Sequence, residues 1–436
     1  MPVMKRLPTL VTSLVVLLGI ASTAGASPVQ PETGFEERGG ADWTTHEEEV
    51  EFLEAVDRES DRIEIDEIGR TLGDRPLHLA QLGDPAPRTA RQARTKPTAL
   101  FVCSQHGNEP AGREACLQWL RDLAFTKDRA LLTLLSRWTV LFVPAANPDG
   151  RAANTRGNST GIDINRDHLN LLSNEAQAIG GVIRDWRPDI VVDLHEYGPG
   201  IPVLYDDDVL YLWPRNLNVD PQVYALSKSL AIDYIGKGAE QSGYTSDEYG
   251  LYAVGDQDVM QTAGDGDEGI LRNAVGLRHG IGILVESRVD MRLSADEATS
   301  APAVNLRRVA SHKQAVADTL RFMEEQEAIV EVATEGAPLR KAKEGRRRSA
   351  PVYFGGADND PPEPAQVQDP PPCGYRLSKA QVATLGPALR LHAIDVASAK
   401  GGVVVTMAQE AEPLIPLLLD ERGIRSSTAG EPLTKC

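Results

Sequence analysis

Short apolar runs alternate with polar and helical segments through the middle of this chain. Four runs are rich in β-branched or aliphatic residues, and they cover residues 98–103, 139–143, 189–194 and 281–285. Strands that are buried on both faces of a sheet read as continuous apolar runs of this kind. The alternation with helical segments is typical of an α/β domain, so we expect a largely buried sheet.

Two further elements are expected before the first run. Thr45 and Glu48 match the capping-box pattern, and apolar residues follow at helical spacing, which predicts a helix over residues 45–57. Residues 63–82 alternate between apolar and polar around Gly73 and Asp74. This pattern predicts a hairpin that feeds the sheet.

Residue types that bind metals or transfer protons follow the apolar runs. His106 and Glu109 come after the first run, the sequence NPDG at 147–150 after the second, His195 after the third and Glu286 after the fourth. Ligands of open α/β sheets bind beyond the carboxyl ends of the strands. We therefore expect these positions to converge on one crevice.

His106, Glu109 and His195 form a candidate zinc site. Catalytic zinc takes three nitrogen, sulfur or carboxylate ligands and leaves a fourth position for water. The spacing of His106 and Glu109 also occurs in solvated loops, but His195 closes a separate buried strand, where an unpaired imidazole would be costly. Metal-binding histidines usually donate their second nitrogen to a carboxylate, which makes Asp163 or Asp193 a candidate partner. The other histidines lack partners at ligand spacing.

Glu286 is the candidate catalytic carboxylate. A metal-bound water needs a base to accept its proton, and a carboxylate at the end of the run 281–285 is placed for that role. The alternative is a strand-end Glu that faces solvent. The apolar residues before Glu286 indicate a central strand instead.

A loop at residues 156–167 lies between the two candidate histidine ligands and carries Arg156 and Arg166. Arginine presents a planar fork that suits a carboxylate, so the loop is a candidate site for a carboxyl-terminated substrate. The same arginines could instead pair with Asp163 and Asp167 on the surface.

The order of these motifs resembles the zinc metallocarboxypeptidase family. The likeness runs from about Trp43 to Arg292 and rests on the motifs HGNE, NPDG, the loop that begins at Arg156, GIDINRD, DLHEY and LVESR, in the family's order. It implies a doubly wound, mixed and mostly parallel sheet with helices on both faces. It also implies one zinc ion per chain.

The resemblance implies a role for each candidate residue. Zinc would be bound by His106, Glu109 and His195, and Glu286 would act as general base and acid. Arg156 matches the arginine that polarises the scissile carbonyl. Asn165 and Arg166 match the pair that binds the C-terminal carboxylate of the substrate. Asp163 matches the carboxylate that orients the first zinc histidine.

The chain departs from the family pattern in one place. The family's mobile tyrosine, which covers bound substrate, is expected about twenty residues before Glu286, where this chain reads AGDGDEGILRN. Tyr249 and Tyr252 are only loose substitutes. The stretch has three acidic residues that would favour a basic substrate side chain if they lined the pocket, and that would otherwise be solvated: Asp265, Asp267 and Glu268.

Composition changes this picture mainly through charge. The 436 residues carry a formal net charge of -18 at pH 7, with 41% hydrophobic and 25% charged residues, within the ordinary globular range. Binding to phosphates needs clustered Lys and Arg, so we expect no nucleic-acid partner.

The first residues predict export. Lys5 and Arg6 precede an apolar run at 10–20 and a small-residue cleavage site at 24–26, which together predict a signal peptide over residues 1–26. The apolar run is shorter than the roughly 20 residues that span a bilayer. We therefore favour a cleaved signal over an uncleaved anchor, and expect a secreted, extracellular protein with no stable membrane insertion.

The rest of the chain divides by composition. We expect a catalytic domain at 27–335, a basic and Pro-rich linker at 336–372 and a small C-terminal region at 373–436. The four cysteines allow three pairings. Cys373 and Cys436 bracket the C-terminal region, whereas Cys103 and Cys116 are expected as either a bridge or buried thiols.

These observations lead us to expect a zinc-dependent metallocarboxypeptidase, a monomer that hydrolyses the C-terminal peptide bonds of peptide or protein substrates. One alternative keeps the same metal ligands in a zinc amidohydrolase acting on bacterial cell-wall peptides or N-acyl amino acids, as relatives of the family do. Another is a non-catalytic peptide-binding relative, against which the intact Glu286 and Arg156 speak.

Overall fold

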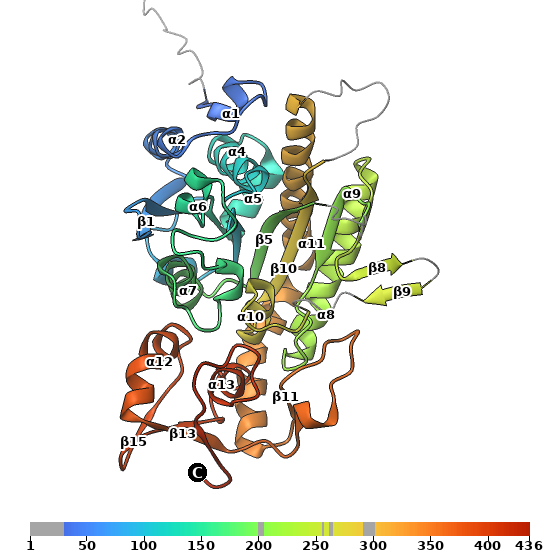
Figure 1. Ribbon diagram of the computed structural model, residues 1–436. Coiled ribbons are helices and arrows are strands. Elements are labelled where there is room, and N and C mark those ends of the chain that lie inside the picture. Colours follow the sequence, from blue (N-terminus) through green and yellow to red (C-terminus); the bar gives the residue numbers. More distant parts are fainter. Residues whose placement is uncertain (1–29, 199–204, 255–256, 261–264, 291–300) are drawn as a thin grey trace, which may run out of the picture. The chain divides into compact units, whose positions relative to one another are not determined.

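The computed structural model describes residues 30–198, 205–254, 257–260, 265–290 and 301–436 (Figure 1). The expected signal peptide at residues 1–26 lies outside this part of the chain. None of the described helices is both long and apolar enough to cross a membrane.

An eight-stranded mixed sheet lies at the centre of the fold, in the order β1-β2-β4-β3-β5-β10-β6-β7. The four apolar runs of the sequence form its central strands, which are parallel to one another. Four of the seven neighbouring pairs are parallel, which confirms the expected mixed, mostly parallel sheet. The strands are β1 (Ile63–Arg70), β2 (Pro76–Leu82), β3 (Thr98–Cys103), β4 (Thr139–Val143), β5 (Ile190–Tyr197), β6 (Val209–Leu212), β7 (Ser246–Glu248) and β10 (Ile281–Arg288).

Alternate residues of the central strands face two separate hydrophobic cores. In β3, Phe101 belongs to the core on one face of the sheet, and Leu100 and Val102 belong to the core on the other. The first core is covered by α2 (His46–Glu59), α4 (Ala111–Phe125), α5 (Arg129–Arg137), the π-helical segment η2 (Leu230–Gly236) and α11 (Ala301–Arg347). The second is covered by α7 (Asn174–Trp186) and α10 (Leu271–Leu277). Helices on both faces confirm the doubly wound arrangement.

The remaining elements of this part are short. They are α1 (Gly34–Glu37), α3 (Ala90–Ala93), α6 (Pro148–Ala153), η1 (Ile164–Arg166), α8 (Pro221–Ser229), α9 (Lys237–Gln241), and the hairpin of β8 (Leu251–Val254) and β9 (Gln257–Met260). The helix and hairpin expected near the N-terminus are confirmed as α2, which Thr45 and Glu48 cap reciprocally, and as the antiparallel pair β1 and β2.

The expected linker at 336–372 differs from the structure in its first part, because helix α11 continues to Arg347 and includes Pro338. Its basic run consists largely of strong helix formers. Buried residues also recur along it every three or four positions, at Val330, Ala333, Ala337 and Lys341. Beyond α11, residues 348–372 contain only β11 (Val352–Tyr353), η3 (Pro364–Gln366) and β12 (Val367–Gln368).

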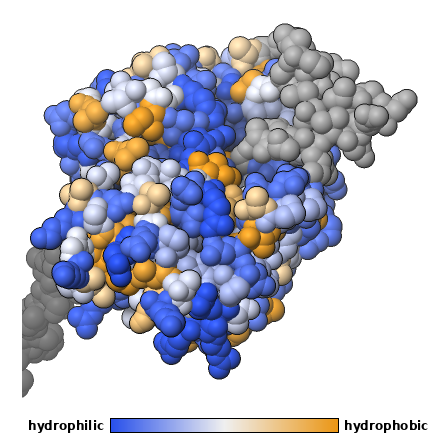
Figure 2. All heavy atoms as spheres, turned by 60° about the horizontal axis from the view of Figure 1, so that its bottom comes forward, coloured by the Kyte–Doolittle hydropathy of each residue, from blue (hydrophilic) through white to orange (hydrophobic). Residues whose placement is uncertain are grey.

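The C-terminal region at 373–436 forms a four-stranded sheet in the order β14-β15-β13-β16. Its elements are β13 (Gly374–Ser378), α12 (Lys379–Leu391), β14 (Ala397–Ala399), β15 (Gly402–Thr406), α13 (Leu414–Leu419) and β16 (Glu431–Leu433). Its apolar residues share one core with Leu169, Val219 and Leu277 of the preceding part. On the face shown in Figure 2, hydrophobic residues occur in small groups between hydrophilic ones.

Pro31–Cys436 form one compact unit. The boundaries expected between the catalytic domain, the linker and the C-terminal region therefore stay a prediction.

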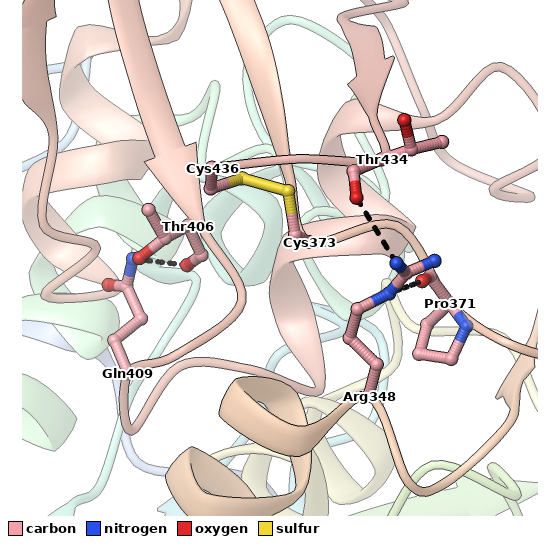
Figure 3. Close-up of a disulfide and its surroundings, with 7 residues drawn as sticks. All are labelled: Arg348, Pro371, Cys373, Thr406, Gln409, Thr434 and Cys436. Carbon is pink, nitrogen blue, oxygen red and sulfur yellow. Dashed lines mark hydrogen bonds between the residues drawn. A yellow bond between two sulfur atoms is a disulfide. The ribbon is translucent and has the colours of Figure 1, made fainter.

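Both candidate cysteine pairs form disulfides. The Cys373–Cys436 bond closes the C-terminal region (Figure 3). Beside it, Arg348 donates to the carbonyl oxygens of Pro371 at 2.6 Å and Thr434 at 3.2 Å, and so ties the same two segments together. The Cys103–Cys116 bond joins the end of β3 to α4. It decides the alternative that the sequence left open.

Candidate metal centre and active site

Two separate segments position the candidate zinc ligands. His106 and Glu109 lie in the turn between β3 and α4, and His195 lies on the neighbouring parallel strand β5. The turn packs directly on the backbone of α6: a Cβ atom at Gly107 would overlap the backbone of Gly150, so this position needs glycine. The NPDG motif thus supports the HGNE turn.

The three ligand side chains converge in a buried cluster. The Nδ1 atom of His106 lies 2.8 Å from one carboxylate oxygen of Glu109, and Nδ1 of His195 lies 2.9 Å from the other. The two Nδ1 atoms are 3.1 Å apart. Both outer nitrogens face carboxylates, Nε2 of His106 at 3.1 Å from Asp163 and Nε2 of His195 at 2.7 Å from Asp193. Protons held at Nε2 by these carboxylates leave both Nδ1 lone pairs directed at one another, an arrangement that a cation between them stabilises.

The electrostatics of the cluster also favour positive charge. Burial alone would lower the pKa of His195, but the carboxylates of Asp193 and Glu109 outweigh it and raise that pKa well above the usual value for histidine. Burial raises the pKa of Glu109, and the two imidazoles outweigh this effect and hold it well below its usual range. Burial raises the pKa of Asp163, but the hydrogen bond and charge of His106 together with the charges of Arg156 and Arg166 outweigh burial and lower it.

Glu286 lies beside the ligand cluster on β10. It pairs with His195 across the parallel strands β10 and β5. The residue is only 8% exposed, and its Oε2 atom is buried without a hydrogen-bond partner in the described part of the chain. Burial outweighs the attraction of His195 and raises the pKa of Glu286 to about 7. It therefore does not face solvent from a strand end.

The arginine loop closes the same site from another side. Arg156 donates from Nε to Asp163 at 3.0 Å, and its Nη1 lies 3.6 Å from Glu109. Arg166 donates from Nη1 to the carbonyl oxygen of Asn165 at 2.8 Å. Both side chains are partly exposed, by 49% for Arg156 and 32% for Arg166. Either guanidinium can reach a ligand in the cavity.

Asn165 is placed differently from a residue that only contacts substrate. It is buried, and its Nδ2 atom lies 3.0 Å from Asp193 and 2.8 Å from Nε2 of His195. Its Oδ1 atom accepts a hydrogen bond from the backbone of Leu271 at 2.8 Å. In this arrangement Asn165 supports the metal cluster and the start of α10.

One cavity of about 420 Å³ brings the predicted site together. It is lined by all of the predicted catalytic, carboxylate-binding and metal-binding residues: His106, Glu109, Arg156, Asn165, Arg166, His195 and Glu286. Asp163 supports it through His106. The volume is in the range of small-molecule sites. Tyr249 lines the cavity as well, whereas the side chain of Tyr252 lies outside the described residues.

Several lining residues were not predicted from the sequence. They are Tyr197, Leu212, Ile270, Arg272 and Leu284, among others. Tyr197 ends the DLHEY motif, so its position at a strand end was a usable signal. Leu284 likewise opens the LVESR motif, whereas Leu212, Ile270 and Arg272 lie outside the motifs.

The acidic stretch before Glu286 is divided between two environments. Asp265 lines the cavity, and burial raises its pKa to about 6 even though Arg215 lies 3.8 Å away. Asp267 and Glu268 instead bind Arg425 of the C-terminal region. Only one of the three carboxylates is thus available to a substrate side chain in the cavity.

A buried ion pair between Glu196 and Arg308 lies next to the candidate metal cluster. The side chain of Glu196 accepts hydrogen bonds from the backbone of Ala111 at 2.9 Å and from Arg308 of α11 at 2.6 Å. The backbone of Glu196 donates to the ligand Glu109 at 3.0 Å. Glu196 therefore joins the strand of His195 to the helix that follows Glu109.

Comparisons with known proteins match part of the chain. Residues 49–260 match the family model described as zinc carboxypeptidase. A carboxypeptidase 2 of Trichophyton tonsurans is 34% identical over 191 residues, 42% of this chain and 35% of that protein. Carboxypeptidase E of Caenorhabditis elegans is 27% identical over 213 residues, 45% of this chain and 40% of that protein. The alignments thus span less than half of either relative.

Among solved structures, a metallo-carboxypeptidase from Pseudomonas aeruginosa in complex with (2-guanidinoethylmercapto)succinic acid has a TM-score of 0.49 at 16% identity, covering 64% of this chain and 69% of that one.

His106, Glu109 and His195 lie within the family match, which ends before Glu286. Residues 49–260 of this chain are thus similar to the zinc carboxypeptidase family.

Proposed function

We propose that this protein is a zinc-dependent metallocarboxypeptidase that removes residues from the C-terminus of peptides or proteins. The observation that carries the proposal is the convergence of His106, Glu109 and His195 in one cavity with Glu286 and Arg166. Metal ligands, a buried carboxylate and a cationic fork are the parts that hydrolysis of a carboxyl-terminated peptide requires.

The donor set fits zinc. The ligand atoms of His106, Glu109 and His195 lie within 4.8 Å of one another, and two imidazole nitrogens with one carboxylate are usual ligands of catalytic zinc. Asp163 and Asp193 hold the outer ring nitrogens, as carboxylates commonly do around zinc. Zinc bound there would polarise a carbonyl group and lower the pKa of a water molecule.

Glu286 is the proposed general base and acid. Its unpartnered, buried oxygen faces the cluster from the neighbouring strand, and burial raises its pKa to about 7. A carboxylate with a pKa near neutrality can accept a proton from the attacking water and return it to the leaving amine. This role needs both the acidic and the basic form of Glu286 during one turnover.

The two arginines are proposed to bind the substrate. Arg166 lines the cavity and presents a planar fork to the C-terminal carboxylate of the peptide. Arg156 lies beside Glu109 at the cavity wall, where it would stabilise negative charge that develops on the carbonyl oxygen.

The cellular setting is part of the proposal. A cleaved signal peptide at residues 1–26 and two disulfides suit a protein secreted into an oxidising compartment. A monomer that acts on peptide or protein substrates and binds no nucleic acid agrees with the net charge of -18.

The first test combines metal content with peptide trimming. The purified protein should contain about one zinc per chain. It should shorten a mixed peptide library by single C-terminal residues, read by mass spectrometry. Chelation should stop the trimming, and added zinc should restore it. Bound zinc without trimming would favour cell-wall peptides or N-acyl amino acids as substrates, and absence of bound metal would contradict the proposal.

Removal of Arg308 should weaken both the fold and the metal site. In Arg308→Met, the Glu196 carboxylate, fully buried, loses its charged partner. We expect a loss of about 3 kcal/mol in the free energy of unfolding and about a tenfold weaker zinc affinity. Urea denaturation and competition with a chelator measure the two effects.

Matched variants separate the role of this ion pair from a general effect on α11. Adding Glu196→Gln to Arg308→Met removes the buried charge and should restore most of the stability. Arg346→Met, at an exposed position of the same helix, should change neither quantity. Unchanged zinc affinity in Arg308→Met would show that Glu196 does not help to hold the ligands.

A further inference from the structure

The C-terminal region reaches the loop that forms one wall of the candidate active site. Arg425 follows α13 and binds Asp267 with its guanidinium group. Its Nε atom lies 3.0 Å from both carboxylate oxygens of Asp267, and its Nη2 atom donates to one of them. Its backbone nitrogen donates to Glu268 at 2.9 Å, and its carbonyl oxygen accepts from Asn170 at 2.7 Å. Arg425 is thus held by its side chain and by its backbone.

The loop that Arg425 holds is joined to the arginine loop of the active site. The carbonyl oxygen of Gly269 accepts a hydrogen bond from the backbone of His168 at 3.0 Å, two residues after Arg166. Asp267 lies between two guanidinium groups: besides its contacts with Arg425, one of its oxygens is 3.9 Å from Nε of Arg166. The same carboxylate therefore faces the cation assigned to the substrate.

Asp267 is a potential competitor of the substrate. Its side chain is only 8% exposed, so its negative charge requires a partner in the protein. Among the described residues, the cations within 4 Å of it are Arg425 and Arg166. Without Arg425, the remaining partner would be Arg166. A carboxylate of the protein would then occupy the fork that should bind the carboxylate of the peptide.

We propose that Arg425 is a positioning residue for substrate binding: by pairing with Asp267, it keeps Arg166 available for the C-terminal carboxylate of the peptide. This inference rests on the proposed carboxypeptidase function and extends it to a region outside the family match. The C-terminal region then contributes to substrate binding through Arg425, in addition to packing against the rest of the chain.

The test compares steady-state kinetics of single and double variants. The substrate is an N-acylated dipeptide with a free C-terminal carboxylate, and each variant is the full chain loaded with zinc. In Arg425→Met, Asp267 pairs with Arg166, and we expect KM to rise about tenfold, the size of one charge-assisted hydrogen bond. Because the reacting groups are untouched, kcat should stay within about twofold. Arg425→Lys keeps the charge and should rescue part of the effect.

The double variant distinguishes this role from simple loss of structure. Adding Asp267→Asn to Arg425→Met removes the competing charge, so KM should return close to that of the wild type. If Arg425 only stabilised the loop, the double variant would be at least as impaired as the single one. Arg422→Met is the matched control, since Arg422 pairs with Asp420 within the C-terminal region and should leave KM unchanged.

The outcomes separate this inference from the function on which it rests. A wild type that trims no C-terminal residue overturns the proposed function and this inference with it. An active wild type with an unchanged KM in Arg425→Met, or an equally raised KM in the double variant, overturns the role of Arg425 alone. Recovery in the double variant supports it.

Discussion

Glu286→Gln should lower kcat by about a thousandfold, within the range that positioned general acid–base groups contribute. Glutamine keeps the size and one hydrogen-bonding oxygen of the side chain, but it cannot accept the proton of the attacking water. Glu286 is not among the three converging ligands, so the zinc content should remain that of the wild type. The substitution also removes a buried carboxylate whose pKa is raised to about 7 by burial, so the fold should not be weakened.

The measurement is kcat on a carboxyl-terminated dipeptide together with metal content by mass spectrometry. Glu51→Gln, at an exposed position of α2, is the matched control and should behave as the wild type. A kcat within a few-fold of the wild type in Glu286→Gln would exclude Glu286 as the base. Loss of activity together with loss of zinc would indicate a structural effect instead.

Gly107→Ala should abolish most of the activity through the backbone, without altering any side chain of the site. The added Cβ would overlap the backbone of Gly150 and Arg151, which cannot rotate away as a side chain can. The turn that carries His106 and Glu109 must then shift. A displacement of about 1 Å costs on the order of a hundredfold in rate.

Zinc affinity and kcat should therefore fall together in Gly107→Ala, which separates this variant from Glu286→Gln. The chain offers a control in Gly181 of α7, where a Cβ would meet nothing within 4 Å. Gly181→Ala should keep full activity and gain up to about 1 kcal/mol in stability, because alanine favours helix. Normal zinc affinity in Gly107→Ala would contradict the close packing of the HGNE and NPDG motifs.

The central part of the fold and of the site followed from local patterns. Buried parallel strands are continuous apolar runs, and the residues after them are placed by the strand ends, so His106, Glu109, His195 and Glu286 converge as expected. Asp163 and Asp193 were expected as alternative partners of a metal-binding histidine, and the structure places Asp163 at His106 and Asp193 at His195. Their assembly depends on strand order, which is governed by general rules for α/β sheets.

Contacts between distant charges could not be predicted in this way. Glu196 and Arg308 are 112 residues apart, and Asp267 and Arg425 are 158 apart. An ion pair has no sequence period, and a surface Arg or Glu looks the same in the sequence as one that becomes buried. Residues 336–347 were assigned to a linker for a related reason: the run is polar, and only a narrow side of this part of helix α11 is buried.

By itself, the sequence determined the sheet, the candidate metal ligands and the candidate catalytic carboxylate, because each depends on short segments whose apolar period or strand-end position is local. Only the tertiary structure decided how the site is supported and which acidic residues face it. Asp265 lines the cavity, while Asp267 is bound by Arg425 of the C-terminal region. These outcomes depend on which surfaces pack together, and packing is a property of the whole chain.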